Sequence, residues 1–196
     1  MIPTALFRAL ACVLASTLVA CASAPDAASP SGANETEGAA ELPHLPARDG
    51  LHLLEYQIEI EAPPEVVWER MLSPEGYAEW TKPFGPSTTF EGSWQEGERM
   101  RFLNPGNSGM VAVIAASRPA NLLVIQHVGM VVNGVEDTTS EGIRAWAPAH
   151  ENYHLRPTAT GTLLSVQHEC LDGFEGYMDV VWPRSLEALK TLCEGS

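Results

Sequence analysis

The chain has 196 residues, of which 25 are acidic and 11 basic, so its formal net charge is −14 at neutral pH. A chain this acidic, with few basic clusters, does not attract nucleic acid or anionic lipid headgroups, and we expect no nucleic-acid partner. The length allows one folded domain and a tail.

The first segment of the chain carries a single charge, Arg8, and from Ala9 to Ala20 it is apolar apart from Ser16 and Thr17. As a helix this run would extend about 18 Å, which is too short to cross a hydrocarbon core of about 30 Å. A short apolar run that ends in small residues is typical of a secretory signal, which we assign to residues 1–20.

The end of this segment, Leu18-Val-Ala-Cys21, resembles the bacterial lipoprotein box. The resemblance implies cleavage before Cys21 and a diacylglycerol on its sulfur, which would anchor the protein at a membrane surface. An ordinary signal peptide with a chance cysteine is the alternative. The resemblance thus implies a lipid-anchored location in the cell envelope. Since Ala22 rather than Asp follows the cysteine, it further implies the outer membrane, facing the periplasm, if the host is Gram-negative.

The segment 21–50 is rich in Ala, Ser, Pro, Gly and Glu and has few large apolar side chains. Such a segment cannot bury enough surface to offset its chain entropy, so it is predicted to be a flexible tether. We expect the folded domain over residues 51–196.

The domain begins with a predicted strand, in which Tyr56, Ile58 and Ile60 share one face and polar residues the other. Pro63-Pro64 then predicts a helix start. Ser73-Pro74 predicts the end of this helix and the start of a second short one, which ends near Trp80.

The middle of the domain, from residue 88 to residue 171, consists of short apolar runs separated by turns. Turn signals occur at Asn104-Pro-Gly, around residues 118–121 and at Asn133-Gly134. The pattern predicts about six antiparallel strands.

The last element is a predicted helix over residues 174–192, with an apolar stripe at three- and four-residue spacing formed by Met178, Val181, Trp182, Ser185, Leu186, Leu189 and Leu192. Cys170 and Cys193 would lie at opposite ends of this helix, so we expect no disulfide between them. No CxxC spacing occurs, and we predict neither a metal site nor a cofactor.

This order of elements predicts an α+β fold, in which a curved antiparallel sheet of six to seven strands wraps around the long C-terminal helix. One helix cannot fill the whole concave side of such a sheet. We therefore expect an internal cavity, which is the usual form of a small-molecule site.

The segments IEIEAPPEVVWERMLSPEGYAEW and WPRSLEALKTLCE, in this order of elements, resemble the START/SRPBCC superfamily of helix-grip domains. The pieces HVGMVVNGVEDTTSEG, HENYHL and GTLLSV are similar to the branch of activator-of-heat-shock-ATPase homologues. The resemblance covers about residues 53–194. The superfamily includes lipid carriers, hormone receptors and polyketide cyclases, so the fold does not set the function.

The resemblance implies that large side chains line the cavity, with core packing as the alternative role: Trp80, Phe84, Met100, Phe102, Tyr153, Met178 and Trp182. Methionine and aromatic groups make an adaptable apolar wall. We expect Tyr153 and His168 to supply polar contacts to a ligand.

The sequence offers two candidate catalytic residues, both histidines. His127 and His168 could face the cavity from neighbouring strands and act as an acid or base, but hydrogen-bonded sheet histidines are the alternative. His150 and His154 lie on one predicted strand, about 13 Å apart, too far to share a metal ion. No arrangement of a nucleophile with a histidine and an acid is legible.

The sequence thus favours a membrane-tethered module that binds a small hydrophobic ligand, lipid-like or aromatic. A cyclase- or hydrolase-type enzyme with a cavity histidine as acid or base is the first alternative. An envelope chaperone cofactor, which rests on the family label, is the second. The sequence does not indicate an oligomeric state.

Overall fold

The computed structural model describes residues 42–195. The predicted signal segment, the predicted lipidation site Cys21 and most of the predicted tether lie outside the described residues. Arg48, at the end of the predicted tether, forms an isolated bridge with Leu51 and packs on the domain. Its guanidinium donates to the carbonyl oxygen of Trp146 over 2.6 Å.

The first three elements are the strand β1 (Leu51–Ile60) and the helices α1 (Pro64–Leu72) and α2 (Pro74–Trp80). The other elements follow in chain order as β2 (Thr89–Glu91), β3 (Arg99–Leu103), β4 (Gly109–Arg118), β5 (Leu122–Val132), β6 (Val135–Asp137), α3 (Glu141–Arg144), β7 (Ala149–Pro157), β8 (Thr162–Leu171) and α4 (Glu175–Glu194).

The corner between α1 and α2 is set by local chemistry. Ser73 ends α1, and its Oγ accepts a hydrogen bond of 3.2 Å from the backbone N–H of Gly76, which caps α2. A Cβ on Gly76 would lie 1.8 Å from the carbonyl oxygen of Arg70, so only glycine allows the two helices to approach this closely. The indole N–H of Trp80 donates to the carbonyl oxygen of Met71 over 2.9 Å, which fixes the end of α2 on α1.

All strands pair antiparallel in one sheet, in the order β1-β8-β7-β5-β4-β3-β2, with β6 paired to β5. The sheet has eight strands among the described residues rather than the six or seven expected, since the Asn133-Gly134 turn folds the three-residue β6 back on β5. Both turn residues have positive φ, 51° and 83°, as such a tight hairpin requires. Two irregularities in the β4–β5 pairing add bends that help the sheet to curve.

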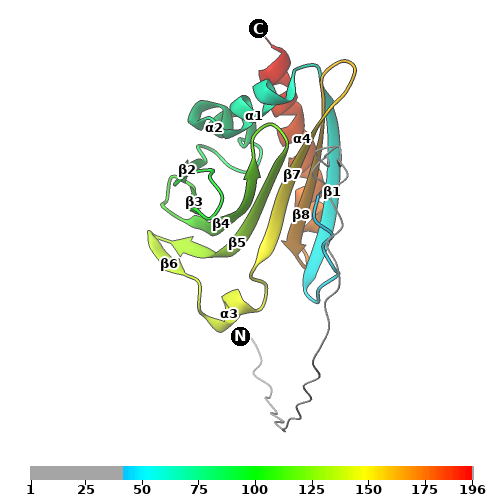
Figure 1. The fold of residues 1–196 in the computed structure, drawn as a ribbon. Helices are drawn as coiled ribbons and strands as arrows, with labels where there is room; N and C mark the ends of the chain where they lie inside the picture. The colour runs from blue at the N-terminus through cyan, green and yellow to red at the C-terminus, as the bar shows by residue number, and fades with distance from the viewer. Residues whose placement is uncertain (1–41, 196) are drawn as a thin grey trace, which may run out of the picture. The chain divides into compact units, whose positions relative to one another are not determined.

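The helices lie at the two ends and on one side of this curved sheet (Figure 1). α1 and α2 are at one end and α3 at the other, whereas α4 packs against β1, β8 and both short helices. The buried residues of α4 are Val181, Trp182, Ser185, Leu186 and Leu189. The α+β helix-grip architecture and most of the predicted stripe of α4 are thus confirmed, and Cys170 and Cys193 are free, as expected.

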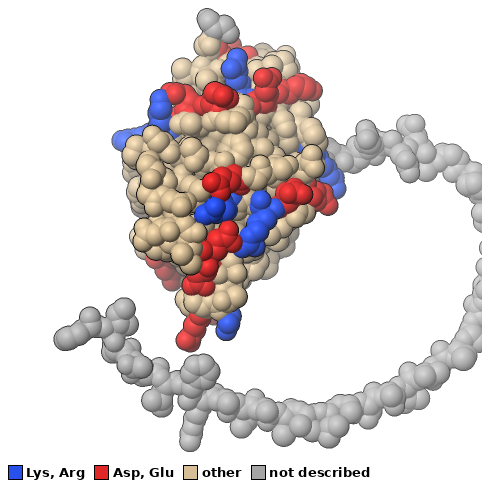
Figure 2. Space-filling view, turned by 90° about the vertical axis from the view of Figure 1, so that its left-hand side faces the viewer, with Lys and Arg blue, Asp and Glu red and all other residues tan. Residues whose placement is uncertain are grey.

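On the face that looks left in Figure 1, acidic and basic side chains are interspersed (Figure 2). Arg99 and Arg101 of β3 form ion pairs with Glu136 of β6 over 2.5 and 3.4 Å, and Arg101 also pairs with Glu91 of β2 over 2.7 Å. These pairs tie the short edge strands together. Among the helices of the described residues, none has the length and apolar character that a membrane span requires.

The packing of α4 gives a stability prediction. Leu189→Ala should lower the free energy of unfolding by about 2–5 kcal/mol, because the fully buried side chain leaves a cavity in the core. Urea denaturation measures the change. Arg184→Ala, an exposed position on the same helix, is the matched control and should change it by less than about 0.5 kcal/mol. A Leu189→Ala protein as stable as the control would contradict the core position of α4.

Candidate functional site

A cavity of about 170 Å³ lies between α2, the loop after it, the sheet and α4. Its lining is Tyr77, Trp80, Thr81, Phe84, Thr88, Phe102, Met110, His127, Glu151, His168, Met178 and Trp182. Most of these side chains are apolar or aromatic. Besides Tyr77 of α2, three are ionisable, His127, Glu151 and His168, and they come from β5, β7 and β8, which are adjacent in the sheet.

A second hollow, of about 200 Å³, adjoins the first. Met110, His127, His168 and Met178 line both, so we call the two together the groove. The second hollow is also lined by Leu51, Met130, Trp146, Ala149, Glu169, Cys170, Leu171 and Phe174. Of these, Met130, Leu171 and Phe174 are 43, 41 and 52% exposed, so the outer end of the groove has an apolar rim open to solvent.

Trp182 of α4 is the centre of the aromatic wall. Its ring centroid lies 5.0 Å from that of Phe84, 5.5 Å from that of His168 and within 6.5 Å of three further rings, those of Tyr56, Trp80 and Tyr153. Rings from the sheet, α2, the loop after it and α4 therefore hold one another in place.

The polar part of the groove is built around Glu151 of β7. Its Oε2 lies 3.4 Å from Nε2 of His127 and 3.5 Å from Nδ1 of His168. The phenol of Tyr153 donates a hydrogen bond to Oε1. Strand register explains the grouping: Glu151 is directly opposite His168, and Ala149, two residues earlier on the same face, is opposite His127.

The two histidines keep the carboxyl of Glu151 ionised. Burial by itself raises the pKa of Glu151, but the imidazoles of His127 and His168 beside the carboxylate outweigh burial and hold that pKa well below its usual range. For Tyr153, burial and the adjacent Glu151 carboxylate together raise the pKa well above its usual value. The phenol therefore stays protonated and serves as a donor to Glu151.

The groove collects most of the side chains that the sequence analysis assigned to a ligand site. Six of them line the first hollow together with the catalytic candidate His127: Trp80, Phe84, Phe102, His168, Met178 and Trp182. Met100 does not line it but is fully buried in the core. Tyr153 does not line either hollow, but it donates a hydrogen bond to Glu151, which does. A ligand-binding role for these residues stays a prediction.

Sequence reasoning missed Glu151, which stands at the centre of the site. The signal was present, since Tyr153 was assigned to the cavity wall and strand alternation puts Glu151, two residues earlier, on the same face. The expectation that His127 and His168 lie on neighbouring strands is wrong, because β7 lies between β5 and β8. That intervening strand supplies the carboxylate both histidines contact.

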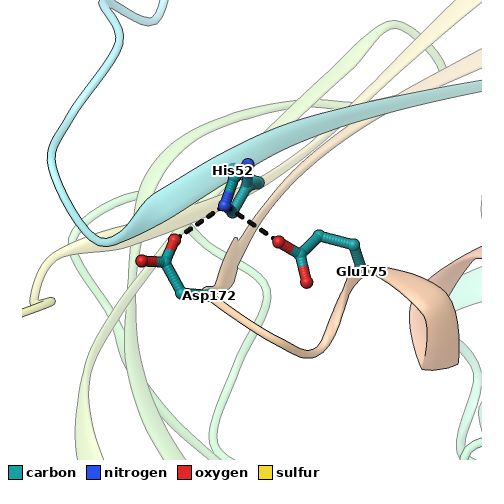
Figure 3. A group of neighbouring side chains, drawn as sticks. All are labelled: His52, Asp172 and Glu175. Atoms are coloured by element: carbon teal, nitrogen blue, oxygen red, sulfur yellow. Dashed lines mark ion pairs between the residues drawn. The ribbon is translucent and has the colours of Figure 1, made fainter.

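Two further histidines, His150 and His52, have acidic partners outside this group. His150 Nδ1 lies 2.7 Å from Glu169 Oε2, so this ring is held by a buried carboxylate. On the surface, His52 Nε2 lies 2.7 Å from Asp172 and 2.9 Å from Glu175 (Figure 3). One nitrogen and two oxygens could hold a divalent metal, but all three side chains are at least partly exposed. Their ion pairs hold the first turn of α4 on β1.

Comparison with known proteins shows the fold. No protein-family model matches the chain, and no curated protein matches it. Among solved structures, the Aha1 dimer of Colwellia psychrerythraea has a TM-score of 0.57 at 18% identity, over 74% of this chain and 97% of that one.

Two bacterial crystal structures are similarly close. A Mesorhizobium loti protein has a TM-score of 0.55 at 18% identity, over 72% of this chain and 96% of its own. A Chromobacterium violaceum protein has a TM-score of 0.54 at 21% identity, over 74% and 98%. At these identities the comparison shows the fold alone, and the expected fold is confirmed, since this chain shares it with all three proteins.

The ionised Glu151 predicts a pH-dependent stability difference. Because its pKa is lowered on folding, the ionised carboxylate stabilises the domain above its ordinary value of 4.5, and this contribution is lost as the pH falls below that value. Glu151→Gln should therefore cost about 1–2 kcal/mol at pH 7 and progressively less towards pH 3.

Urea denaturation of both proteins between pH 7 and pH 3 measures this difference. Glu59→Gln, at an exposed position of β1, is the control and should give a small difference that does not change with pH. A Glu151→Gln difference that stays constant over this range would show that the histidines do not favour the ionised form.

Proposed function

We propose that the domain binds a small hydrophobic molecule in the groove between the sheet and α4. The observation that carries the proposal is the continuity of two apolar hollows that share four lining residues and open at an apolar rim. Small-molecule sites are mostly apolar concavities with a few placed polar groups, and His127, Glu151 and His168 are such groups.

The groove is suited to an elongated or flat ligand. Two hollows of about 170 and 200 Å³ are small for a whole lipid, but Met110 and Met178 stand where they meet. Methionine side chains are flexible and adapt to irregular apolar shapes, so the two hollows can adjust where they meet to the shape of a bound ligand. Phe174 and Met178 belong to the start of α4, and we infer that this end of the helix acts as the lid.

A membrane-tethered location belongs to the same proposal. The lipoprotein-box resemblance at Cys21 would place a lipid before the predicted tether, and an acylated cysteine holds a protein at a bilayer through its buried methylenes. A tethered hydrophobic-ligand module at the cell envelope would have its ligands, lipid-like or aromatic, in the adjacent membrane.

An enzyme is the second candidate, and the position of Glu151 favours it. A carboxylate in contact with an imidazole orients that ring, which is the arrangement used for general-base catalysis. His127 and His168 would then act as bases towards a bound molecule. A neutral-pH activity lost in His168→Ala, with ligand binding retained, would favour this reading.

Filling the groove tests the binding proposal. Met178→Trp places a larger side chain where the two hollows meet, and we expect affinity for a fluorescent apolar probe, N-phenyl-1-naphthylamine, to fall at least about tenfold. Val180→Trp is the matched control, because Val180 lies two residues after Met178 on α4 but is exposed and lines neither hollow. It should leave the affinity unchanged.

Fluorescence titration gives both affinities, and thermal unfolding checks that both variants are folded. Equal binding by the Met178→Trp protein and the native protein would argue against the groove as the binding site. So would an equal loss in the Val180→Trp protein.

The anchor has its own test. Cys21→Ser, expressed in a bacterial host, should move the protein from the membrane fraction to the soluble fraction and remove the acyl mass from the mature N-terminus. Cys12→Ser, inside the apolar run, is the control and should remain with the membranes. Immunoblots of the fractions and intact-mass measurement provide the readout. A Cys21→Ser protein that still carries acyl chains would refute lipidation at this residue.

A further inference from the structure

Five buried nitrogens along the groove form no hydrogen bond within the described residues: both ring nitrogens of His127, both of His168, and Nε1 of Trp182. Nε2 of His127 and Nδ1 of His168 still lie 3.4 and 3.5 Å from Oε2 of Glu151. The other three, Nδ1 of His127, Nε2 of His168 and Nε1 of Trp182, have neither a hydrogen bond nor an ion pair within the described residues. His127 is only 5% exposed, so solvent does not satisfy it from outside. Buried polar groups are almost always hydrogen-bonded, and an unpaired one at a cavity points to a partner that arrives with a ligand.

The contacts with Glu151 decide what the unpaired histidine nitrogens can do. An ionised carboxylate only accepts hydrogen bonds, so the nitrogens that face it, Nε2 of His127 and Nδ1 of His168, carry the protons. In a neutral imidazole the other nitrogen is then an acceptor. Glu151 thus orients two acceptors in a groove that is otherwise apolar.

Charge excludes the other classes of polar ligand group. An anionic headgroup would be repelled by the ionised carboxylate of Glu151, and none of the described lysines or arginines lines either hollow. An ammonium group would have to leave water for a mostly apolar groove. Both oxygens of Glu151 also already face donors, Tyr153 at Oε1 and the two histidines at Oε2. A neutral hydrogen-bond donor is what remains.

We propose that the ligand carries a hydroxyl group on an aromatic or similar apolar frame, and that its O–H donates to His127 Nδ1 or His168 Nε2. This inference rests on the proposed function and names the ligand class for the same groove. Trp182 lines the first hollow beside His168, with ring centroids 5.5 Å apart. Its indole N–H, a donor only, is available to the oxygen of the same hydroxyl.

A pair of probes that differ only at the hydroxyl tests the proposal on the native protein. Equilibrium dialysis at pH 7.5 compares 2-naphthol with its methyl ether, 2-methoxynaphthalene. The naphthol should bind about three- to tenfold more tightly, which is the effect of one hydrogen bond to a buried acceptor. The ether is the more apolar of the two, so burial alone would favour it.

Variants identify the acceptor. His127→Phe or His168→Phe should reduce the preference for naphthol to about one, with the affinity for the ether retained. Glu151→Gln should weaken the preference, because the orientation of both rings is lost. His44→Phe and Glu59→Gln, at exposed positions that line neither hollow, are the matched controls and should keep the native ratio.

Different outcomes would contradict the hydroxyl proposal and the proposed binding function. Equal affinity of the native protein for both probes would overturn the hydroxyl assignment and leave apolar binding intact. Binding of neither probe would overturn the proposed function itself. A native preference that persists when both histidines are replaced would show that the acceptor lies elsewhere.

Discussion

The arrangement depends on the packing of one indole, that of Trp182, between the curved sheet and the two short helices. Its ring contacts aromatic or imidazole groups from β1, α2, the loop after α2, β7 and β8. Each contact is worth on the order of 1 kcal/mol beyond the burial of the ring. Because the contacts come from elements far apart in the sequence, α4 can take only one position along the sheet, and the groove is the space which that position leaves.

Glu169 and Glu151, on the adjacent strands β8 and β7, are two carboxylates with different partners. Glu169 of β8 is paired with the guanidinium of Arg48 at 3.4 Å and with His150 at 2.7 Å, so its charge is met by a permanent cation. Glu151 of β7 has two histidines and a phenol instead of a guanidinium. A carboxyl group whose pKa is strongly shifted by its neighbours, in the wall of a cavity, is typical of the places where proteins bind or react.

Sequence patterns predicted what depends on short-range periodicity. The strand alternation from Tyr56, the proline-marked starts of α1 and α2 and the stripe of α4 are local, and the fold follows from their order. The groups that meet across strands were not predictable in the same way, since register joins residues that are distant along the chain. Periodicity also cannot tell a cavity wall from a core, and Met100, assigned to the wall, packs in the core.

The clamp at Arg48 has a mechanical consequence. Its guanidinium holds the carbonyl oxygens of Trp146 and Pro148 and the carboxylate of Glu169, and Trp146 and Glu169 belong to the wall of the outer hollow. Tension applied through the chain before Arg48 would therefore load this wall first and the distant core later. Strain along the leading segment would thus act on the outer hollow of the groove before it acts on the rest of the fold.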